Sequence, residues 1–252
     1  MNRNTDSDAP FIARIQDAIQ RCGRRNVPQF VGFLDERQAM LARREAQRDG
    51  TSSFLFYGGH ADAERTMLGI FPENREASVS EFPIAPLTAR YRPVDTLTHR
   101  DFLGGLMSCG IERSTVGDIL IEDGRAVLFV SRSMTPYLLD QLEKVGRVGI
   151  KLNEGAEEPY PAGRGFETLE GTVSSMRLDA VVAALLLISR EKSAALIKAG
   201  LVQLRFETTE NLSAEVRPED KLSVRGYGRF QLEKIGSVTR KGRYKFLARK
   251  YI

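Results

Sequence analysis

The chain of 252 residues is 42% hydrophobic and 28% charged, so it can bury a core in one large domain or in two to three small ones. Its longest apolar run, residues 180–188, is too short for the ~20 residues of a membrane-spanning helix, and the polar start of the chain lacks the apolar segment of a signal peptide. Cys22 and Cys109 lie far apart and outside any His/Cys cluster, which argues against a disulfide framework and a zinc site. We therefore expect a cytoplasmic protein with reduced thiols, no metal, no cofactor and no membrane partner.

The net charge of +4 is distributed unevenly along the chain. Residues 175–252 carry 16 Lys and Arg against 8 Asp and Glu, whereas the rest of the chain is slightly acidic. Within residues 225–252, Glu233 is the only acidic residue, and aromatic and aliphatic side chains recur as in a folded sheet. A basic end on a slightly acidic body predicts a polyanion-binding module, although charge alone fits a solvated basic tail equally well.

The first quarter of the chain is predicted to form a helical unit. Residues 1–10 are expected to be a disordered tail, followed by this unit over residues 11–75. Apolar spacing predicts one helix from Phe11 to Cys22 and a second that starts near Pro28 and continues to residue 48. A short strand is expected at 53–57, ended by two glycines, and a further helix at 61–68.

The next segment, residues 76–155, has the element order of a ferredoxin-like or RRM-like domain. We expect strands at 82–91, 118–122, 125–130 and 147–152 and helices at 99–109 and 136–145, with Asp123-Gly124 as a hairpin turn. The strand after this turn offers one aromatic side chain, Phe129, where an RNA-reading RRM carries several. Docking on protein or on the ribosome therefore remains open for this domain. Residues 153–165, rich in Gly, Pro and Glu, are the predicted linker.

The last domain, residues 166–252, is predicted to place two short helices before a small sheet. A helix is expected over residues 177–187, and the hydroxyl of Ser189 can cap a second helix. Gly200 should end that helix because glycine tolerates the left-handed conformation of a helix stop, and a strand follows from Val202. The predicted fold class is thus α+β throughout.

Several short motifs in residues 175–230 resemble the alpha-L RNA-binding module, which is named after a small-subunit ribosomal protein. The matching residues are Arg177-Leu178-Asp179, Ser189-Arg190, Ile197 through Val202, Asp220 and Val224-Arg225-Gly226. One position departs from the pattern: the strand after Gly200 usually ends in Asn and an aromatic residue, and here it reads Arg205-Phe206. Arginine cannot copy the donor-acceptor pair of an amide, so the usual RNA contact of the pattern is not expected at this point.

Further motifs extend the resemblance to roughly residues 30–252, where the chain is similar to the YlmH-like proteins. They are His99 through Gly104, Gly117 through Leu120, Gly58-Gly59 before Ala63-Glu64-Arg65, and Arg225 through Phe230. The resemblance implies a helical N-terminal unit, an RRM-like middle domain and an alpha-L module. It also implies association with the large ribosomal subunit and with quality control of stalled translation, beside an older link to cell division.

The candidate RNA-binding residues are basic side chains and one helix cap. Proteins often read an A-form RNA helix by its shape, which requires Arg and Lys on a rigid surface and a helix N-terminus that can hold a phosphate. Asp179 is expected to be structural, early in a helix and near free N–H groups. The candidate site residues are Arg177, Ser189, Arg190, Lys192, Lys198, Arg205, Arg225, Arg229, Lys241 and Arg243. Ribosomal RNA and tRNA are the expected partners, without a small-molecule substrate.

An RNA-modifying enzyme is one alternative, because alpha-L modules are often attached to pseudouridine synthases or methyltransferases. The Arg177-Leu178-Asp179 triplet lies inside the binding module instead of in a catalytic sheet, and no glycine-rich loop has the spacing of a methyltransferase or dinucleotide site. His60 and His99 have no nucleophile beside them in sequence. We therefore predict a non-catalytic, ribosome-associated RNA-binding protein. A protein adaptor in cell division is the other alternative, with contacts carried by the acidic N-terminal half.

Overall fold

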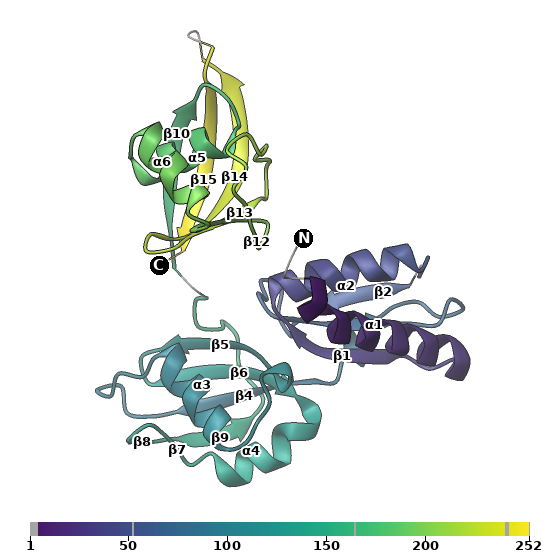
Figure 1. Ribbon diagram of the computed structural model, residues 1–252. Coiled ribbons are helices and arrows are strands. Elements are labelled where there is room, and N and C mark those ends of the chain that lie inside the picture. The colour runs from purple at the N-terminus through teal and green to yellow at the C-terminus, as the bar shows by residue number, and fades with distance from the viewer. Residues whose placement is uncertain (1–4, 52, 164, 240–241, 252) are drawn as a thin grey trace. The chain divides into compact units, whose positions relative to one another are not determined.

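The computed structural model describes residues 5–51, 53–163, 165–239 and 242–251. The chain divides into two compact units, residues 1–163 and 164–252, which are described separately below (Figure 1). No helix within the described ranges is both long and apolar enough to cross a bilayer.

The first unit begins with two helices on a three-stranded antiparallel sheet. The elements are α1 (Thr5–Arg25), β1 (Gln29–Leu34), α2 (Glu36–Arg48), β2 (Phe54–Tyr57) and β3 (Thr66–Ile70), and the sheet order is β1-β3-β2. Side chains of α1, α2, β1 and β3 form a buried cluster between the helices and the sheet. The helix α1 starts inside the segment 1–10 that was expected to be disordered, and residues 1–4 lie outside the described ones.

Of the helices predicted in this region, the one starting near Pro28 is confirmed only from Glu36 onward, and the one at 61–68 is wrong. The segment after Pro28 is the strand β1, because Asp35 forms a capping box with Gln38 and starts α2 only at Glu36. The segment 61–68 is a turn followed by the strand β3, which lies in the centre of the sheet. Both segments carry apolar side chains on two opposite faces, toward two different cores. Over so few residues, this pattern cannot be distinguished from the apolar spacing of a helix.

The rest of the first unit confirms the ferredoxin-like order. It contains β4 (Ile84–Arg90), α3 (His99–Ser108), β5 (Val116–Glu122), β6 (Arg125–Ser131), α4 (Thr135–Gln141) and β9 (Lys151–Glu154), with a small hairpin of β7 (Lys144–Val145) and β8 (Val148–Gly149). The sheet order β5-β6-β4-β9 places the second strand of the motif at one edge and the fourth at the other. Helix α4 ends four residues earlier than predicted, because Val145 belongs to β7.

Strand β6 is buried on both of its faces. Ala126, Leu128 and Val130 point to the core with α3 and α4, whereas Val127 and Phe129 belong to a second cluster with residues of β1, β2 and β3. The face of the four-stranded sheet that lies away from its helices is therefore packed against the N-terminal strands.

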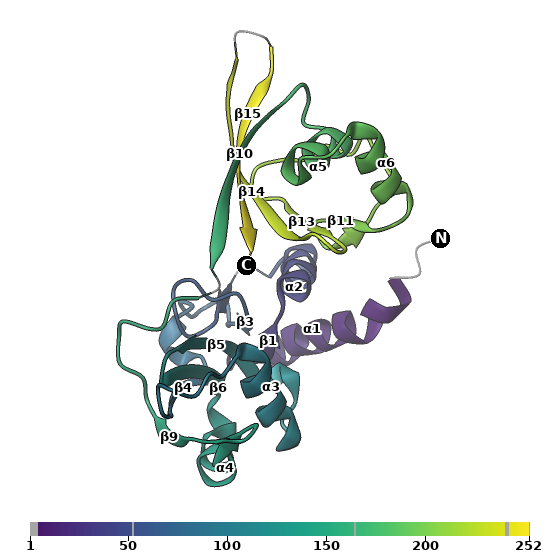
Figure 2. The same ribbon diagram turned by 90° about the vertical axis from the view of Figure 1, so that its left-hand side faces the viewer.

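The second unit is a six-stranded antiparallel sheet with two helices on one face (Figure 2). Its elements are β10 (Phe166–Val173), α5 (Leu178–Leu186), α6 (Arg190–Lys198), β11 (Val202–Leu204), β12 (Glu207–Thr208), β13 (Lys221–Val224), β14 (Gly228–Val238) and β15 (Tyr244–Tyr251). The sheet order is β10-β15-β14-β13-β11-β12, and the core lies between the sheet and the helix pair. The two predicted helices, the Ser189 cap and the Gly200 stop are confirmed.

Candidate RNA-binding site

Asp179 joins two of the candidate arginines at the start of the helix pair. One of its carboxylate oxygens accepts from Arg177 Nε at 3.1 Å and from the Ala180 N–H at 3.0 Å, and the other accepts from Arg190 at 2.6 Å. The carboxylate is 9% exposed, whereas the two arginine side chains are 44% and 54% exposed. Asp179 thus fixes two guanidinium groups while much of each stays open to solvent, where each retains donors for a phosphate.

The charge of Asp179 depends on these two arginines. Burial acts to raise the pKa of the Asp179 carboxyl, but the hydrogen bonds from Arg177 and Arg190 outweigh burial, so the pKa lies below its usual value. The backbone carbonyl of the same residue accepts from the buried hydroxyl of Ser193 at 2.8 Å. The predicted structural role of Asp179 therefore extends to positioning the basic groups of both helices.

The N-terminus of α6 is capped by Ser189, whose hydroxyl accepts from the Lys192 N–H at 3.2 Å. Arg190 and Lys192 occupy the first turn, and helix side chains lean toward the N-terminus, so both reach this end of α6. Lys198 lies in the last turn, about 12 Å further along the axis at 1.5 Å per residue. Lys198 is therefore not part of the cluster around Asp179.

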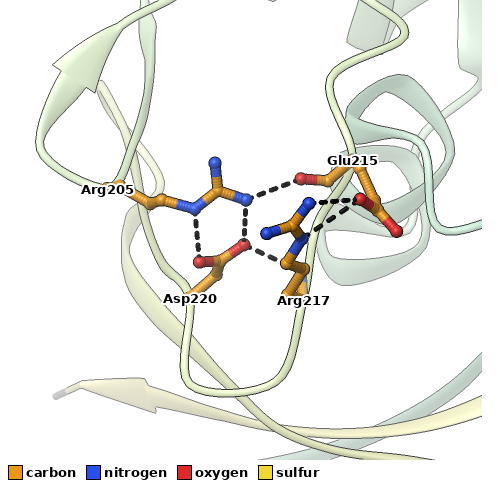
Figure 3. Close-up of polar contacts among 4 residues, drawn as sticks. All are labelled: Arg205, Glu215, Arg217 and Asp220. Carbon is orange, nitrogen blue, oxygen red and sulfur yellow. Dashed lines mark hydrogen bonds and ion pairs between the residues drawn. The ribbon is translucent and has the colours of Figure 1, made fainter.

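Arg205 makes an internal contact that the sequence did not predict. Its guanidinium forms a two-pronged ion pair with Asp220 at 2.6 and 2.7 Å and donates to the Glu215 carbonyl at 2.8 Å (Figure 3). Asp220 is buried and also accepts from the Arg217 N–H at 2.7 Å. The hydrogen bonds to Asp220 raise the pKa of Arg205 above its usual value. Most of its donors are thus engaged in holding the 215–220 loop against the end of β11.

The other candidates are spread over the unit. Arg225 lies in the exposed turn between β13 and β14, and its N–H donates to the Leu201 carbonyl next to the end of α6. Arg229 lies on β14, on the sheet face away from the helices, because its neighbour Phe230 is buried in the helix-side core. Arg243 donates to the hydroxyl and carbonyl of Thr172 on β10. Lys241 lies outside the described residues.

Comparisons with known proteins place the chain in a family. A family model described as "Putative RNA-binding domain in YlmH" matches residues 78–158. The chain is 35% identical over 217 residues to the "Ribosome-associated protein quality control protein P2" of Bacillus subtilis (strain 168), which covers 84% of this chain and 83% of that protein. The chain belongs to the YlmH-like family.

A solved structure supports the fold of this YlmH-like chain. The cell division protein ylmH from Streptococcus pneumoniae matches with a TM-score of 0.54 and 21% identity, over 62% of this chain and 95% of that one. At this identity the match is evidence for the shared fold. It agrees with the mixed α and β architecture described above.

The segment that the YlmH family model matches is the middle domain, and its sheet face is not open. Phe129, the one aromatic candidate for base stacking, is 0% exposed. Its ring packs on His60 at 4.7 Å between centroids and on Tyr160 at 5.6 Å. The double-sided apolar run of β6 was the sequence signal for this burial, because a strand with one solvent face alternates apolar and polar residues.

His60 belongs to the contact that covers this sheet. Its Nε2 lies 3.1 Å from Asp118 on β5, and the same carboxylate accepts from the Glu64 and Arg65 N–H groups. Arg65 in turn donates to the carbonyls of Phe33 and Val116. These bonds fasten the β2–β3 loop onto the middle domain. Within the described ranges, no group of three or more His, Cys, Asp or Glu side chains could hold a metal ion.

Proposed function

We propose that this YlmH-like protein binds structured RNA on the ribosome through the α5–α6 side of its C-terminal unit. The observation that carries this proposal is the pair of arginines, Arg177 and Arg190, held by a buried carboxylate beside the capped N-terminus of α6. Fixed guanidinium groups next to a helix N-terminus suit the phosphates of an A-form RNA. Lys192 and Arg225 add exposed charge near the two ends of α6.

We favour the large subunit of a stalled ribosome as the partner, with ribosomal RNA and tRNA as the nucleic acids that are bound. Support comes from the name of the relative in Bacillus subtilis, a ribosome-associated quality control protein, at 35% identity over most of both chains. A cytoplasmic location is part of the same proposal. The proposed role is non-catalytic, and we assign the His60–Asp118 contact to fastening two parts of the first unit.

Sedimentation with ribosomes in sucrose gradients tests this function. At low salt the wild type should migrate with the large subunit and should dissociate as salt rises, because each phosphate contact contributes a slope of roughly −0.7 to −0.9 in log K against log salt. The variant Arg190→Glu/Arg225→Glu should remain at the top of the gradient. Arg14→Glu/Arg44→Glu, at two exposed positions of the first unit, is the matched control for the change in net charge and should migrate as wild type.

Three results would contradict the proposal. If the wild-type protein stays at the top of the gradient at every salt concentration, ribosome association is excluded and the cell-division adaptor is favoured. Migration that is unchanged in Arg190→Glu/Arg225→Glu would leave ribosome association in place but assign it to another surface. Nucleotide modifications that vanish when the gene is deleted would instead indicate an enzyme.

A further inference from the structure

The C-terminal sheet has a second face, which we call the outer face: the face that points away from α5 and α6. Strand alternation assigns side chains to it, because Leu222, Phe230, Phe246 and Ala248 are buried in the helix-side core. The residues that alternate with them along a strand therefore point outward. Paired residues on neighbouring strands share a face, so Lys234, which lies opposite Leu247 beyond the bulge in β14, also points outward. The outer-face residues used below are Lys221, Arg229, Lys234, Lys245, Arg249 and Tyr251.

Contacts between these side chains confirm that they share one face. Tyr251 donates its hydroxyl hydrogen to Gln231 at 2.7 Å, and Lys221 lies 5.9 Å from the centre of the Tyr251 ring. The Arg249 guanidinium lies 4.3 Å from the centre of the Phe166 ring on the neighbouring strand β10. Basic groups are thus interleaved with aromatic rings across β13, β14, β15 and β10.

The outer face carries both acidic residues and basic residues outside any ion pair, and Glu219 reaches it by accepting from Gln231 at 2.8 Å. Arg249 pairs with Glu233, and Glu170 is the acidic residue that β10 contributes. Arg229, Lys234 and Lys245 are exposed and make no ion pair with any residue that the structure describes. Lys234 lies opposite Leu247, two residues from Lys245 on the neighbouring strand, so these two ammonium groups are held close together and repel each other. Arg229 lies five residues before Lys234 on β14, roughly 16 Å along the strand, and extends the basic surface toward the other end of the sheet. A bound polyanion removes that repulsion.

We propose that the outer face is a second RNA-binding surface, which holds a single-stranded RNA segment while the α5–α6 side holds structured RNA. Single-stranded nucleic acids bind to open sheets on which basic side chains follow the phosphate backbone and aromatic rings stack on bases. The outer face has both basic side chains and aromatic rings. The inference rests on the proposed function for the identity of the polyanion as RNA. It also explains why Arg229 and Arg190, both candidates from the sequence, lie on opposite sides of the unit.

Fluorescence anisotropy with a labelled oligo(U) tests the outer face in the full-length protein. The variant Arg229→Gln/Lys234→Gln/Lys245→Gln should bind oligo(U) about tenfold more weakly or worse, and its salt slope should be smaller by about 2, the value for three lost phosphate contacts. The same variant should still sediment with ribosomes. Arg190→Gln/Lys192→Gln should show the reverse pattern, and the exposed triple variant Arg14→Gln/Arg44→Gln/Arg147→Gln controls for net charge.

The outcomes separate this inference from the proposed function. Unchanged oligo(U) binding in the outer-face variant overturns the inference. The inference is also overturned if Arg190→Gln/Lys192→Gln loses oligo(U) binding to the same extent as it loses sedimentation with ribosomes. If the wild type fails to sediment with ribosomes but binds oligo(U) through the outer face, the proposed function is wrong and this inference stands. Thermal melting of each variant identifies any loss that comes from unfolding.

Discussion

Arg205 combines an unfavourable backbone conformation with a strong side-chain contact. Its φ of 51° and that of Phe206, 66°, lie in the left-handed region, which non-glycine residues other than Asn and Asp seldom adopt. The alpha-L pattern usually places Asn here, which suits this conformation. The bidentate pair with the buried Asp220 offsets the strain and gives a physical reason for the departure.

Replacing Arg205 by Asn should therefore destabilise the C-terminal unit despite restoring the usual residue. The variant relaxes the backbone but leaves Asp220 without its two-pronged partner, which should cost about 1–3 kcal/mol in the free energy of unfolding. Arg217→Asn is the matched control, because Arg217 pairs with Glu215 where both side chains are about two-thirds exposed. That change should stay within about 0.5 kcal/mol. Equal effects in urea denaturation would contradict the assignment.

Asp179 should make the stability of the C-terminal unit depend on pH. The folded-state pKa of Asp179 is below the usual 3.8, so its ionised form stabilises the fold above pH 3.8, and this contribution is lost as the pH falls through the lowered pKa. Asp179→Asn should lower the free energy of unfolding by about 1–3 kcal/mol at neutral pH. The difference between variant and wild type should shrink in acid below pH 3.8. Denaturation at a series of pH values measures it, and a difference that grows in acid would contradict the prediction.

At the scale of elements, local signals predicted most of the fold. Ser189 and Gly200 gave the ends of α6, and Asp123-Gly124 gave the hairpin between β5 and β6, because caps and tight turns depend on a few adjacent residues. The strands β1 and β3 were missed because their apolar residues serve two cores at once. Likewise, no short-range pattern shows that Arg205 pairs with Asp220 or that Arg229 faces away from α6, since strand register and face decide both.

The β2–β3 loop depends on a glycine where it passes the Phe129 ring of the middle domain. Gly59 has a φ of 102°, and a Cβ there would lie 2.3 Å from the Phe129 ring. Gly59→Ala should therefore destabilise the first unit by about 2 kcal/mol or more, through backbone strain and a clash that a fully buried ring cannot relieve. Gly104→Ala is the control: it lies within α3 with nothing near its Cβ, and should stabilise by roughly 0.5–1 kcal/mol. Thermal melting that moves both variants in the same direction would contradict this account.

At the scale of the whole molecule, the first unit is expected to fold as one body although it contains two separate larger sheets beside the β7–β8 hairpin. The cluster between the sheets includes Phe33 and Met67 from the N-terminal strands and Phe129 from the middle domain, each at most 2% exposed. The segment that the family model matches, residues 78–158, lacks the N-terminal half of this cluster. Expressed alone, it would present Val127 and Phe129 to solvent as part of an apolar patch.

We therefore expect residues 1–163 to be monomeric and to unfold cooperatively, and residues 78–158 to aggregate or to bind a hydrophobic dye. The variant Phe129→Glu is informative because we expect it to have opposite effects on the two proteins. In residues 78–158 it should raise the monomeric fraction by breaking the exposed patch, whereas in residues 1–163 it buries a charge without a partner and should abolish the cooperative transition. Size-exclusion chromatography and thermal melting measure both effects on residues 78–158 and on residues 1–163, each as wild type and as Phe129→Glu. A monomeric 78–158 segment with the melting temperature of residues 1–163 would show that the N-terminal strands do not stabilise this sheet, and its face would then be free to bind RNA.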